Sequence, residues 1–334
     1  MTEPTIRDVA RLADVSIASV SRALNGLGNV AEQTRLKIEE AAKQLGYVPH
    51  AGARSLSLAR TRTVGVVLPD MHGEFFSEVI RGMDREASAR DYVLLLSNTH
   101  GTDRAEDALR ALRGRVDGLV MMAPHLMSIE VEDALPPRLP AVLLNAHGAV
   151  TSHSSFRIDN QLGVRLILDH LASTGCRQIV HIAGPSGNVD AQERSEAFRA
   201  VVGDLQRGAE PVVIHGDYGD ESGAAAVRAL VERGIPFDAI FAANDMMAIG
   251  ALTALAEMGR RVPDEVAVAG FDDVPLARYL GLTTARVRID ELGADAIARL
   301  IDIIEEGEDK PVQQLHAPEL IVRQSTAKGQ EQRA

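Results

Sequence analysis

The chain has 334 residues, of which 46% are hydrophobic, and a formal net charge of −12. This length exceeds what one ordinary core can hold and predicts two or three domains. No run reaches the roughly 18 apolar residues of a membrane span, and the opening stretch MTEPTIRDVARLADV has no apolar signal sequence, so we expect a cytoplasmic protein. The single cysteine, Cys176, excludes an internal disulfide and a site built from several thiolates.

The charge is unevenly distributed along the chain. Residues 1–62 contain nine Lys and Arg and six Asp and Glu, a balance of +3, which leaves −15 for the remainder. Taken as one number, the net charge argues against a nucleic-acid partner. A basic N-terminal segment on an acidic body instead indicates a module that meets phosphate while the rest of the chain is repelled from it.

Residues 5–46 predict three short helices with no strand between them. The helices are expected over 6–13 after Thr5, over 17–24 after Ser16, and over 31–45 before Gly46. The third helix is expected to turn its apolar face inward at Leu36, Ile38, Ala41, Ala42 and Leu45. Only residues 13–15 separate the first two helices, a turn length that packs two helices steeply against each other.

From Thr63 onward, short apolar runs alternate with amphipathic helical stretches. The runs are TVGVVLP, YVLLLS, GLVMM, AVLLN, QIVHIAG, PVVIHG, AIFAAN and VAVAGF. Such hydrophobic runs between helices indicate parallel strands covered on both faces. We therefore expect an α/β body of two doubly wound lobes with about four strands each. The chain is expected to cross between the lobes near 156–159 and again near 284–290.

The helix expected over 17–24 carries residue types that suit the major groove of DNA. Ile17 and Ala18 fall in its first turn, where apolar groups can meet thymine methyl groups, and Arg22 can form a bidentate pair with guanine. Short donors for phosphate oxygens are present at Ser16, Ser19 and Ser21. The alternative is a three-helix bundle with a serine-rich solvent face, because helix-turn-helix spacing alone is a weak signal.

The segment TIRDVARLADVSIASVSRALNG, followed by VAEQTRLKIEEAAKQLGYVPHAGARSL, resembles the DNA-binding head of the lactose repressor/galactose repressor (LacI-type) family. Looser matches then follow in family order: TVGVVLPD, EFFSEVIRGMDREA, RVDGLVMM, IDNQLG, AANDMMAIGAL, VPDEVAVAGFDD and LTTARVRID. The resemblance implies a helix-turn-helix head at 1–48, a hinge helix and linker at 49–62, and an effector-binding, dimerising body at 63–334. The N-lobe would contain 63–159 and about 291–326, and the C-lobe about 160–290.

The resemblance implies a repressor that binds a pseudo-palindromic operator as a homodimer, with one head on each half-site. In the family, the leucine that matches Leu56 wedges into the minor groove from a hinge helix that forms on the operator. Gly52 and His50 depart from the family pattern, and Gly52 disfavours helix, so this hinge is expected to order less readily. The residues expected to contact DNA are Thr5, Ser16, Ile17, Ala18, Ser19, Ser21, Arg22, Asn25, Arg54 and Leu56.

The body is expected to bind a small molecule between its lobes, where the carboxyl ends of the strands meet. Polar side chains directly follow strands at Asp70, Asn145, Asn244 and Asp272, and the resemblance adds Arg194, Phe75, Phe76 and Tyr218 as effector contacts. Acids and amides together with an arginine suit a polyhydroxyl ligand, so a sugar is expected, and a nucleobase or sugar phosphate stays open. The strand-end residues have an alternative role as helix caps. One of the two phenylalanines is expected in the core, and Tyr218 has an alternative as a loop residue.

Two rival classes fit the sequence less well. A sugar-binding protein of the periplasmic type would need a secretion signal and no basic head. A dinucleotide-dependent enzyme is suggested by GLGNVA at 26–31, but that motif works only between a strand and a helix, and here it follows a helix. No catalytic motif or clustered metal ligands are present, so neither an enzyme nor a cofactor is expected. Nothing after Thr326 resembles a leucine heptad, so a dimer is expected rather than a tetramer. As a DNA-binding protein, it is expected in the cytoplasm, associated with the nucleoid.

Overall fold

The computed structural model describes residues 4–25, 30–48, 60–71, 73–99, 105–122, 135–136, 138–146, 152–205, 210–307 and 310–327. The chain divides into two compact units. The first contains the residues up to Thr63 together with Arg113–Asp117, and the second contains Val64–Leu112 and the residues from Gly118 onward. We call the three-helix part of the first unit the head and the second unit the body.

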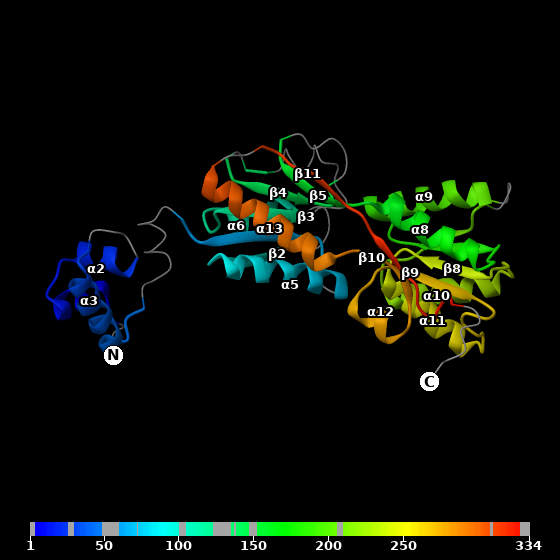
Figure 1. Ribbon diagram of the computed structural model, residues 1–334, viewed down its shortest axis with the longest axis horizontal. Helices are drawn as coiled ribbons and strands as arrows, with labels where there is room; N and C mark the ends of the chain where they lie inside the picture. The colour runs from blue at the N-terminus through cyan, green and yellow to red at the C-terminus, as the bar shows by residue number, and fades with distance from the viewer. Residues whose placement is uncertain are drawn as a thin grey trace. The chain divides into compact units, whose positions relative to one another are not determined.

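The head is a bundle of α1 (Ile6–Ala13), α2 (Ile17–Leu24) and α3 (Glu32–Leu45) (Figure 1). Its core contains Val9, Val20 and Ile38, none of which is exposed. The Ser16 hydroxyl accepts a hydrogen bond from the Ser19 amide and so caps α2, as expected. The head thus gains a small core from three short amphipathic helices.

Leu36 is not a core residue, contrary to the expectation from the sequence. It is 54% exposed, whereas Ile38, Ala41 and Ala42 on the same helix are buried. Leu36 precedes Ile38 by two residues, which places the two side chains about 200° apart around the helix axis, on opposite faces.

The first sheet of the body has six strands. They are β1 (Thr63–Leu68), β2 (Val93–Asn98), β3 (Gly118–Met122), β4 (Ala141–Leu144), β5 (Ser154–Ile158) and β11 (Gln313–His316), in the order β11-β5-β4-β3-β1-β2. The pairings β1 with β3, β3 with β4, β4 with β5 and β5 with β11 are parallel. Its helices are α5 (Glu74–Ala89), α6 (Ala105–Leu112) and α13 (Ile289–Glu306). Helices α5 and α13 pack side by side (Figure 1).

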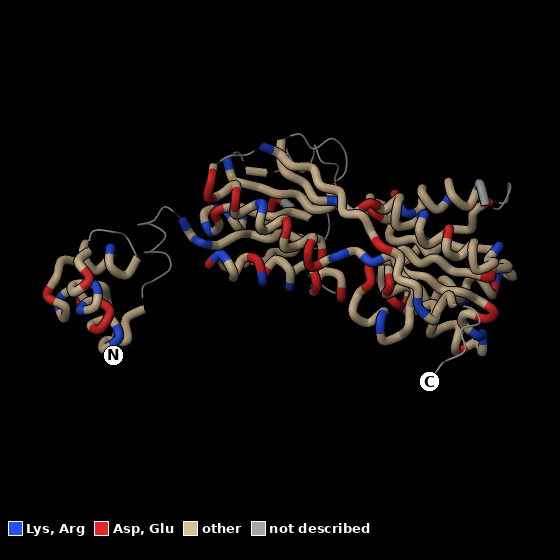
Figure 2. The backbone as a smooth tube through the Cα atoms, in the orientation of Figure 1, with Lys and Arg blue, Asp and Glu red and all other residues tan. Residues whose placement is uncertain are grey.

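The second sheet also has six strands. They are β6 (Ile179–Ala183), β7 (Val213–His215), β8 (Ala239–Ala242), β9 (Ala267–Asp272), β10 (Thr283–Arg286) and β12 (Glu319–Ile321), in the order β12-β10-β9-β8-β6-β7. The short β12 runs antiparallel to β10, whereas the other four pairings of this sheet are parallel. The helices of this lobe are α8 (Asn160–Ser173), α9 (Val189–Leu205), α10 (Asp220–Glu232), α11 (Asp245–Glu257) and α12 (Pro275–Tyr279). Asp and Glu occur along the helices of both lobes, interspersed with Lys and Arg (Figure 2).

The chain passes between the two sheets after β5, after β10 and again between β11 and β12. The third passage corrects the expected lobe boundary, because residues 317–326 were assigned to the N-lobe. Instead, β12 pairs with β10 at the edge of the second sheet, and the Ser325 hydroxyl accepts from the Thr283 amide and donates to the Val268 carbonyl. Each lobe also has six strands rather than about four.

Helices α10 and α11 lie very close together at one side of the second sheet. A Cβ atom on Gly223 would lie 2.1 Å from the Met247 carbonyl oxygen, and one on Gly250 would lie 1.8 Å from the Asp220 carbonyl oxygen. Only glycine permits this approach of the two backbones. The contact fixes the N-termini of both helices, which carry Asp220 and Asn244, at the same end of the sheet.

Among the described residues, no helix combines the length and apolar character needed to cross a membrane. The same residues contain no group of three or more His, Cys, Asp and Glu side chains placed to hold a metal ion.

Candidate functional site

One surface of the head is formed by the exposed side of α2. Ser16, Ile17, Ala18 and Arg22 are exposed there, and Ile17 keeps 45% of its surface accessible despite its apolar side chain. An exposed isoleucine beside an arginine on a two-turn helix has no packing role in this core. The surface therefore combines an apolar probe with a cationic one.

The remaining polar residues of this surface are tied to one another. The Ser16 and Ser19 hydroxyl oxygens lie 2.9 Å apart, and Asn25 Nδ2 donates to the Ser21 hydroxyl at 3.3 Å. Arg22 Nε donates to the Ala18 carbonyl at 3.2 Å, so the side chain folds back along the helix. The structure thus brings Ser16, Ile17, Ala18, Ser19, Ser21, Arg22 and Asn25 together on α2.

Thr5 lies at the start of α1, where its amide and hydroxyl both donate to the Asp8 carboxylate. These bonds also hold the pKa of Asp8 below its usual value. Arg54 and Leu56, and with them the expected hinge helix, lie outside the described residues.

The body contains a pocket of about 850 Å³, hereafter the pocket, lined by residues from both lobes. All eight residues predicted as effector contacts lie in its wall: Asp70, Phe75, Phe76, Asn145, Arg194, Tyr218, Asn244 and Asp272. Most of them follow a strand or begin the helix after it, as the topology of parallel sheets requires. A volume of this size accommodates a small organic ligand.

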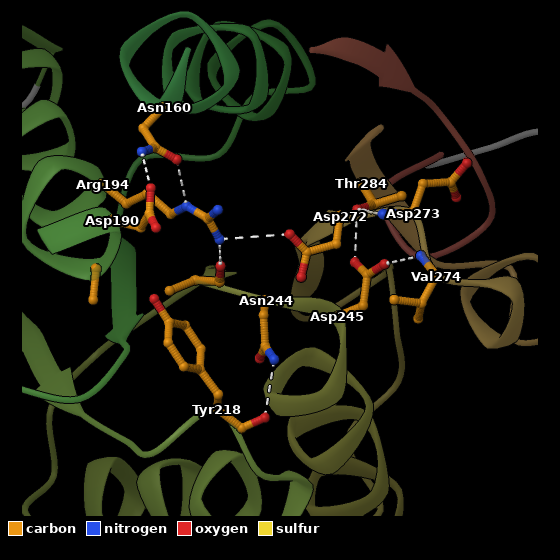
Figure 3. A network of polar contacts seen from close by, with 12 residues as sticks. Asn160, Asp190, Arg194, Tyr218, Asn244, Asp245, Asp272, Asp273, Val274 and Thr284 are labelled. Atoms are coloured by element: carbon orange, nitrogen blue, oxygen red, sulfur yellow. Dashed lines mark hydrogen bonds and ion pairs between the residues drawn. The ribbon is translucent and has the colours of Figure 1, made fainter. Parts of the chain in front are cut away.

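Arg194, on α9, is the centre of the pocket's polar network (Figure 3). Its Nε donates to Asn160 Oδ1 at 2.8 Å, and its Nη1 donates to the Ala243 carbonyl. Its guanidinium carbon lies 3.8 Å from the centroid of the Phe271 ring, a cation–π contact. With only 4% of its surface exposed, Arg194 is held rigidly with its charge facing the pocket's acids.

Asp272 ends β9 opposite Arg194 and is 4% exposed. Burial raises the pKa of Asp272 to about 7, although the Arg194 guanidinium, with Nη1 3.7 Å from Asp272 Oδ1, acts in the opposite direction. Asp272 Oδ1 has no hydrogen-bond donor among the described residues. It is therefore a buried acceptor that a ligand hydroxyl can satisfy.

Asp245 supports the loop that carries Asp272. Its carboxylate accepts from the Thr284 hydroxyl at 2.6 Å and from the Val274 amide at 2.9 Å (Figure 3). Burial, and then the nearby Asp272, raise the pKa of Asp245 well above its usual value. Two buried acids therefore lie next to each other, and Asp272, the one that lines the pocket, faces the ligand space.

Three residues of the pocket wall have left-handed backbone conformations, which are uncommon outside glycine. Asn145 has φ 47°, Tyr218 φ 73° and Asp272 φ 110°. Such conformations cost about 1–3 kcal/mol each for residues with a Cβ and concentrate at functional sites. Asn145 tolerates this region well. Tyr218 does not, and neither does Asp272 at its φ of 110°. The backbone of the pocket wall is therefore strained at Tyr218 and Asp272.

Among the described residues, the helix-capping alternative applies to one of the four strand-end residues. Asn244 caps α11 through its Oδ1, which accepts from the Met247 amide, while its Nδ2 donates to the Tyr218 carbonyl. The helices after Asp70 and Asp272 begin at other caps, Gly73 and Val274. Asn145 instead donates across the lobes to Asp190 at 3.2 Å.

The aromatic residues also differ from the alternatives that the sequence left open. Phe75 and Phe76 are both partly buried and both line the pocket, with ring centroids 5.5 Å apart in an edge-to-face arrangement. Neither is a fully buried core residue. The Tyr218 hydroxyl donates to Asn188 Oδ1 at 3.3 Å, and burial raises the pKa of the phenol, so Tyr218 is not a free loop side chain.

Three polar residues of this network were not predicted: Asn160, Asn188 and Asp190. Asp190 accepts from Asn145 and Asn160 and joins the two lobes, and Asn160 in turn orients Arg194. Asp190 precedes Arg194 by four residues, one turn along the same helix face, so this spacing is a sequence signal that places Asp190 beside Arg194. Asn160 follows β5, a strand that the apolar runs did not identify.

Comparisons with known proteins match both parts of the chain. A family model for bacterial regulatory proteins of the lacI family matches residues 5–50, and one for a periplasmic binding protein-like domain matches residues 168–326. The chain is 35% identical over 333 residues to the ribose operon repressor of Halalkalibacterium halodurans, covering 98% of each chain. It is 34% identical to the transcriptional repressor PurR of Vibrio cholerae, covering 96% of this chain and 97% of the relative.

Solved structures show the same extent of similarity. The lac repressor dimer bound to operator and the anti-inducer ONPF superposes with a TM-score of 0.88 at 29% identity, covering 97% of this chain and 99% of the other. The complex of the regulator CelR with cellobiose superposes with a TM-score of 0.71 at 32% identity, covering 96% and 99%. The similarity thus extends over the head and the body together.

Proposed function

Because the chain belongs to the lacI family of bacterial regulatory proteins, we propose that it represses transcription from a pseudo-palindromic operator under the control of a neutral sugar bound in the pocket. Family membership makes it a DNA-binding repressor controlled by an effector, and not an enzyme. The observation that carries the proposal is that head and body match repressors together over nearly the whole chain. This also argues against a binding protein without a transcriptional role.

The proposed DNA reader is the exposed surface of α2. Ile17 and Ala18 would meet thymine methyl groups, and Arg22, once released from the Ala18 carbonyl, would pair with a guanine edge. Thr5, Ser16, Ser19, Ser21 and Asn25 would contact phosphate or the bases beside it. Arg54 and Leu56 would act from the hinge. The solved lac repressor relative is a dimer on its operator, which supports one head on each half-site here.

The pocket's chemistry favours a neutral polyhydroxyl ligand. Its wall contains six carboxylates, at Asp70, Glu74, Asp190, Asp217, Asp220 and Asp272, against Arg194 as the one cationic side chain among the described lining residues. Asp272 Oδ1 and Asn145 Oδ1 are buried acceptors without a hydrogen bond among the described residues, and hydroxyl groups can supply the donors. One relative is named for the ribose operon and another was solved with cellobiose. A sugar therefore fits better than a phosphorylated ligand.

Control of the operator would pass through the relation of the two lobes. Asn145 donates to Asp190, and Arg157 Nη2 donates to Glu193 Oε1 at 2.8 Å, so bonds across the lobes flank the pocket. A ligand that favours one arrangement of the lobes would shift their equilibrium by the difference in its affinity for the two arrangements. If the arrangement of the lobes determines the positions of the two hinges in a dimer, the ligand also changes the affinity for the operator.

Arg22→Ala tests the proposed reader. The variant is expected to lose about 1–3 kcal/mol of discrimination between the operator and random duplex, because a bidentate arginine–guanine pair is removed. The operator is selected from a palindromic library by the wild-type protein, and affinities are measured by fluorescence anisotropy at two salt concentrations. Arg11→Ala, which removes an exposed arginine of α1, is the matched control and should weaken binding to all sequences alike. Unchanged discrimination in Arg22→Ala would refute its role.

A thermal-shift comparison tests the ligand class. Neutral sugars, ribose and cellobiose among them, are paired with their phosphates and with purine bases. A neutral sugar is expected to raise the melting temperature, since a ligand at 100 times its Kd stabilises by about 2.7 kcal/mol. Its phosphate should give no shift, because the described wall has several carboxylates and only one cationic side chain, Arg194. A larger shift from a phosphate or a base would contradict the sugar proposal and leave the repressor proposal intact.

A further inference from the structure

Asp117 makes an unusual number of contacts at the point where the linker ends. Its Oδ1 accepts from the Thr61 amide at 2.7 Å and from the Thr61 hydroxyl at 2.9 Å, and its Oδ2 accepts from the Arg62 amide at 2.8 Å. Its own amide donates to the Thr63 carbonyl at 2.8 Å. One carboxylate thus fixes two consecutive peptide groups whose sequence separation from it exceeds 50 residues.

The fixed segment has a tightly defined backbone. Arg62 has φ 50°, the left-handed region, and Thr61 and Thr63 exchange bonds on either side of it: the Thr63 amide donates to the Thr61 hydroxyl and the Thr63 hydroxyl donates to the Thr61 carbonyl. A non-glycine residue stays in this region only when its surroundings hold it there. Asp117 supplies the bonds that do so.

The position of this anchor relates it to the linker. Residues 61–63 lead directly into β1, and Asp117 directly precedes β3, its parallel neighbour, with Val64 opposite Gly118. The anchor therefore joins the last residues of the linker to the start of the first sheet. Loss of the anchor would remove the bonds that hold Thr61 and Arg62 and so release the direction in which the chain leaves the first sheet.

We propose that Asp117 is a positioning residue that fixes the exit of the linker and thereby sets the half-site spacing that the two heads of a dimer can reach. The inference rests on the proposed function. A fixed exit concentrates the second head near one position, whereas a released exit spreads it over a larger volume and lowers its effective concentration at the correct half-site. Among the described residues, the hydrogen bonds of the Asp117 carboxylate go to Thr61 and Arg62, and Asp117 is not part of the pocket wall.

The test is a spacing profile of the full-length protein. Palindromic duplexes carry the wild-type operator with the half-site separation changed by one or two base pairs, and each added base pair moves the second half-site by about 3.4 Å and turns it by about 35°. Wild type is expected to prefer one spacing by about tenfold over its neighbours. Asp117→Asn and Asp117→Ala should reduce this preference to about threefold and weaken the best site by about tenfold.

Asp107→Asn is the matched control, because it removes an exposed carboxylate of α6 and changes the net charge by the same amount. It should keep the wild-type profile. A sharp profile in Asp117→Asn together with a lower melting temperature would mean that the anchor only stabilises the fold, and would overturn the proposal. If Asp117→Ala does not fold, Asp117→Asn decides. A flat profile in wild type itself would instead count against the dimeric repressor of the proposed function.

Discussion

Arg194→Met is expected to abolish effector binding and to lower the free energy of unfolding by about 3–5 kcal/mol. The substitution leaves Asn160 Oδ1 and the Ala243 carbonyl without their donor and leaves the buried Asp272 without its counter-charge. Methionine keeps much of the side-chain length over Phe271, so the loss reports the charge and the hydrogen bonds more than a cavity. Isothermal calorimetry with the sugar found in the thermal screen measures binding, and urea unfolding at fixed protein concentration measures stability.

Arg228→Met provides the control for this prediction. Arg228 pairs with Glu257 on the surface of the same lobe, with 47% and 58% of the two side chains exposed, so its loss should cost less than about 1 kcal/mol. Adding Asp272→Asn to Arg194→Met should restore part of the lost stability, because the unpaired buried charge is removed as well. Operator binding should survive in Arg194→Met and cease to respond to the sugar. A variant that still responds would exclude Arg194 from the effector site.

The strand-end residues of the pocket could be predicted because their position follows from topology. Asp70, Asn145, Asn244 and Asp272 each come after an apolar run, and parallel strands bring their carboxyl ends to one edge. Periodicity alone therefore located half of the predicted wall. The assignment of Arg194 and of the aromatic residues as effector contacts depended on the family resemblance.

The bonds that orient those residues could not be predicted in the same way. Asp190 and Asn160 matter because they meet Asn145 and Arg194 in three dimensions, and the sequence separations of 30 to 45 residues between them give no local signal. The strain at Tyr218 is similar, because a left-handed tyrosine is stable only in the finished fold, where its ring lies over Gly184. These features depend on contacts between residues that are far apart in the sequence.

Four strands, β5, β10, β11 and β12, do not appear among the apolar runs, and the last two lie at sheet edges. QQLH in β11 and ELI in β12 are short edge strands with mostly exposed or half-buried side chains, so they lack the apolar runs that identified the central strands. These two strands form because they pair with the edges of β5 and β10, and not because of their own side-chain pattern. For that reason the third passage of the chain between the lobes was not predicted, although the first two were.

His181 gives the body a pH dependence that the sequence did not reveal. It lies on β6 with no exposed surface, donates from Nδ1 to the Phe241 carbonyl at 2.9 Å, and stacks on the Phe241 ring with centroids 4.6 Å apart. Burial lowers the pKa of His181 to about 3. The pKa in the unfolded chain is about 6.5, so between these values only the unfolded state binds the proton. The contribution of His181 to the free energy of unfolding therefore falls by about 1.4 kcal/mol for each pH unit of acidification within that window.

Asp272 contributes to the free energy of unfolding with the opposite pH dependence over nearly the same pH range. Its folded pKa of about 7 lies above the unfolded value of about 3.9, so its contribution to stability is complete below pH 4 and is lost as the pH rises through 7. His181→Phe should therefore lower the slope of unfolding free energy against pH by about 1.4 kcal/mol per unit between about pH 4.5 and 6, and Asp272→Asn should raise it equally. Urea titrations at several pH values measure both slopes, with His215→Gln on the neighbouring β7 as control. Equal slopes in the two variants would contradict this prediction. In the folded protein, burial keeps the Asp272 carboxyl protonated below about pH 7 and the His181 imidazole neutral above about pH 3, so the two substitutions must change the slope in opposite directions.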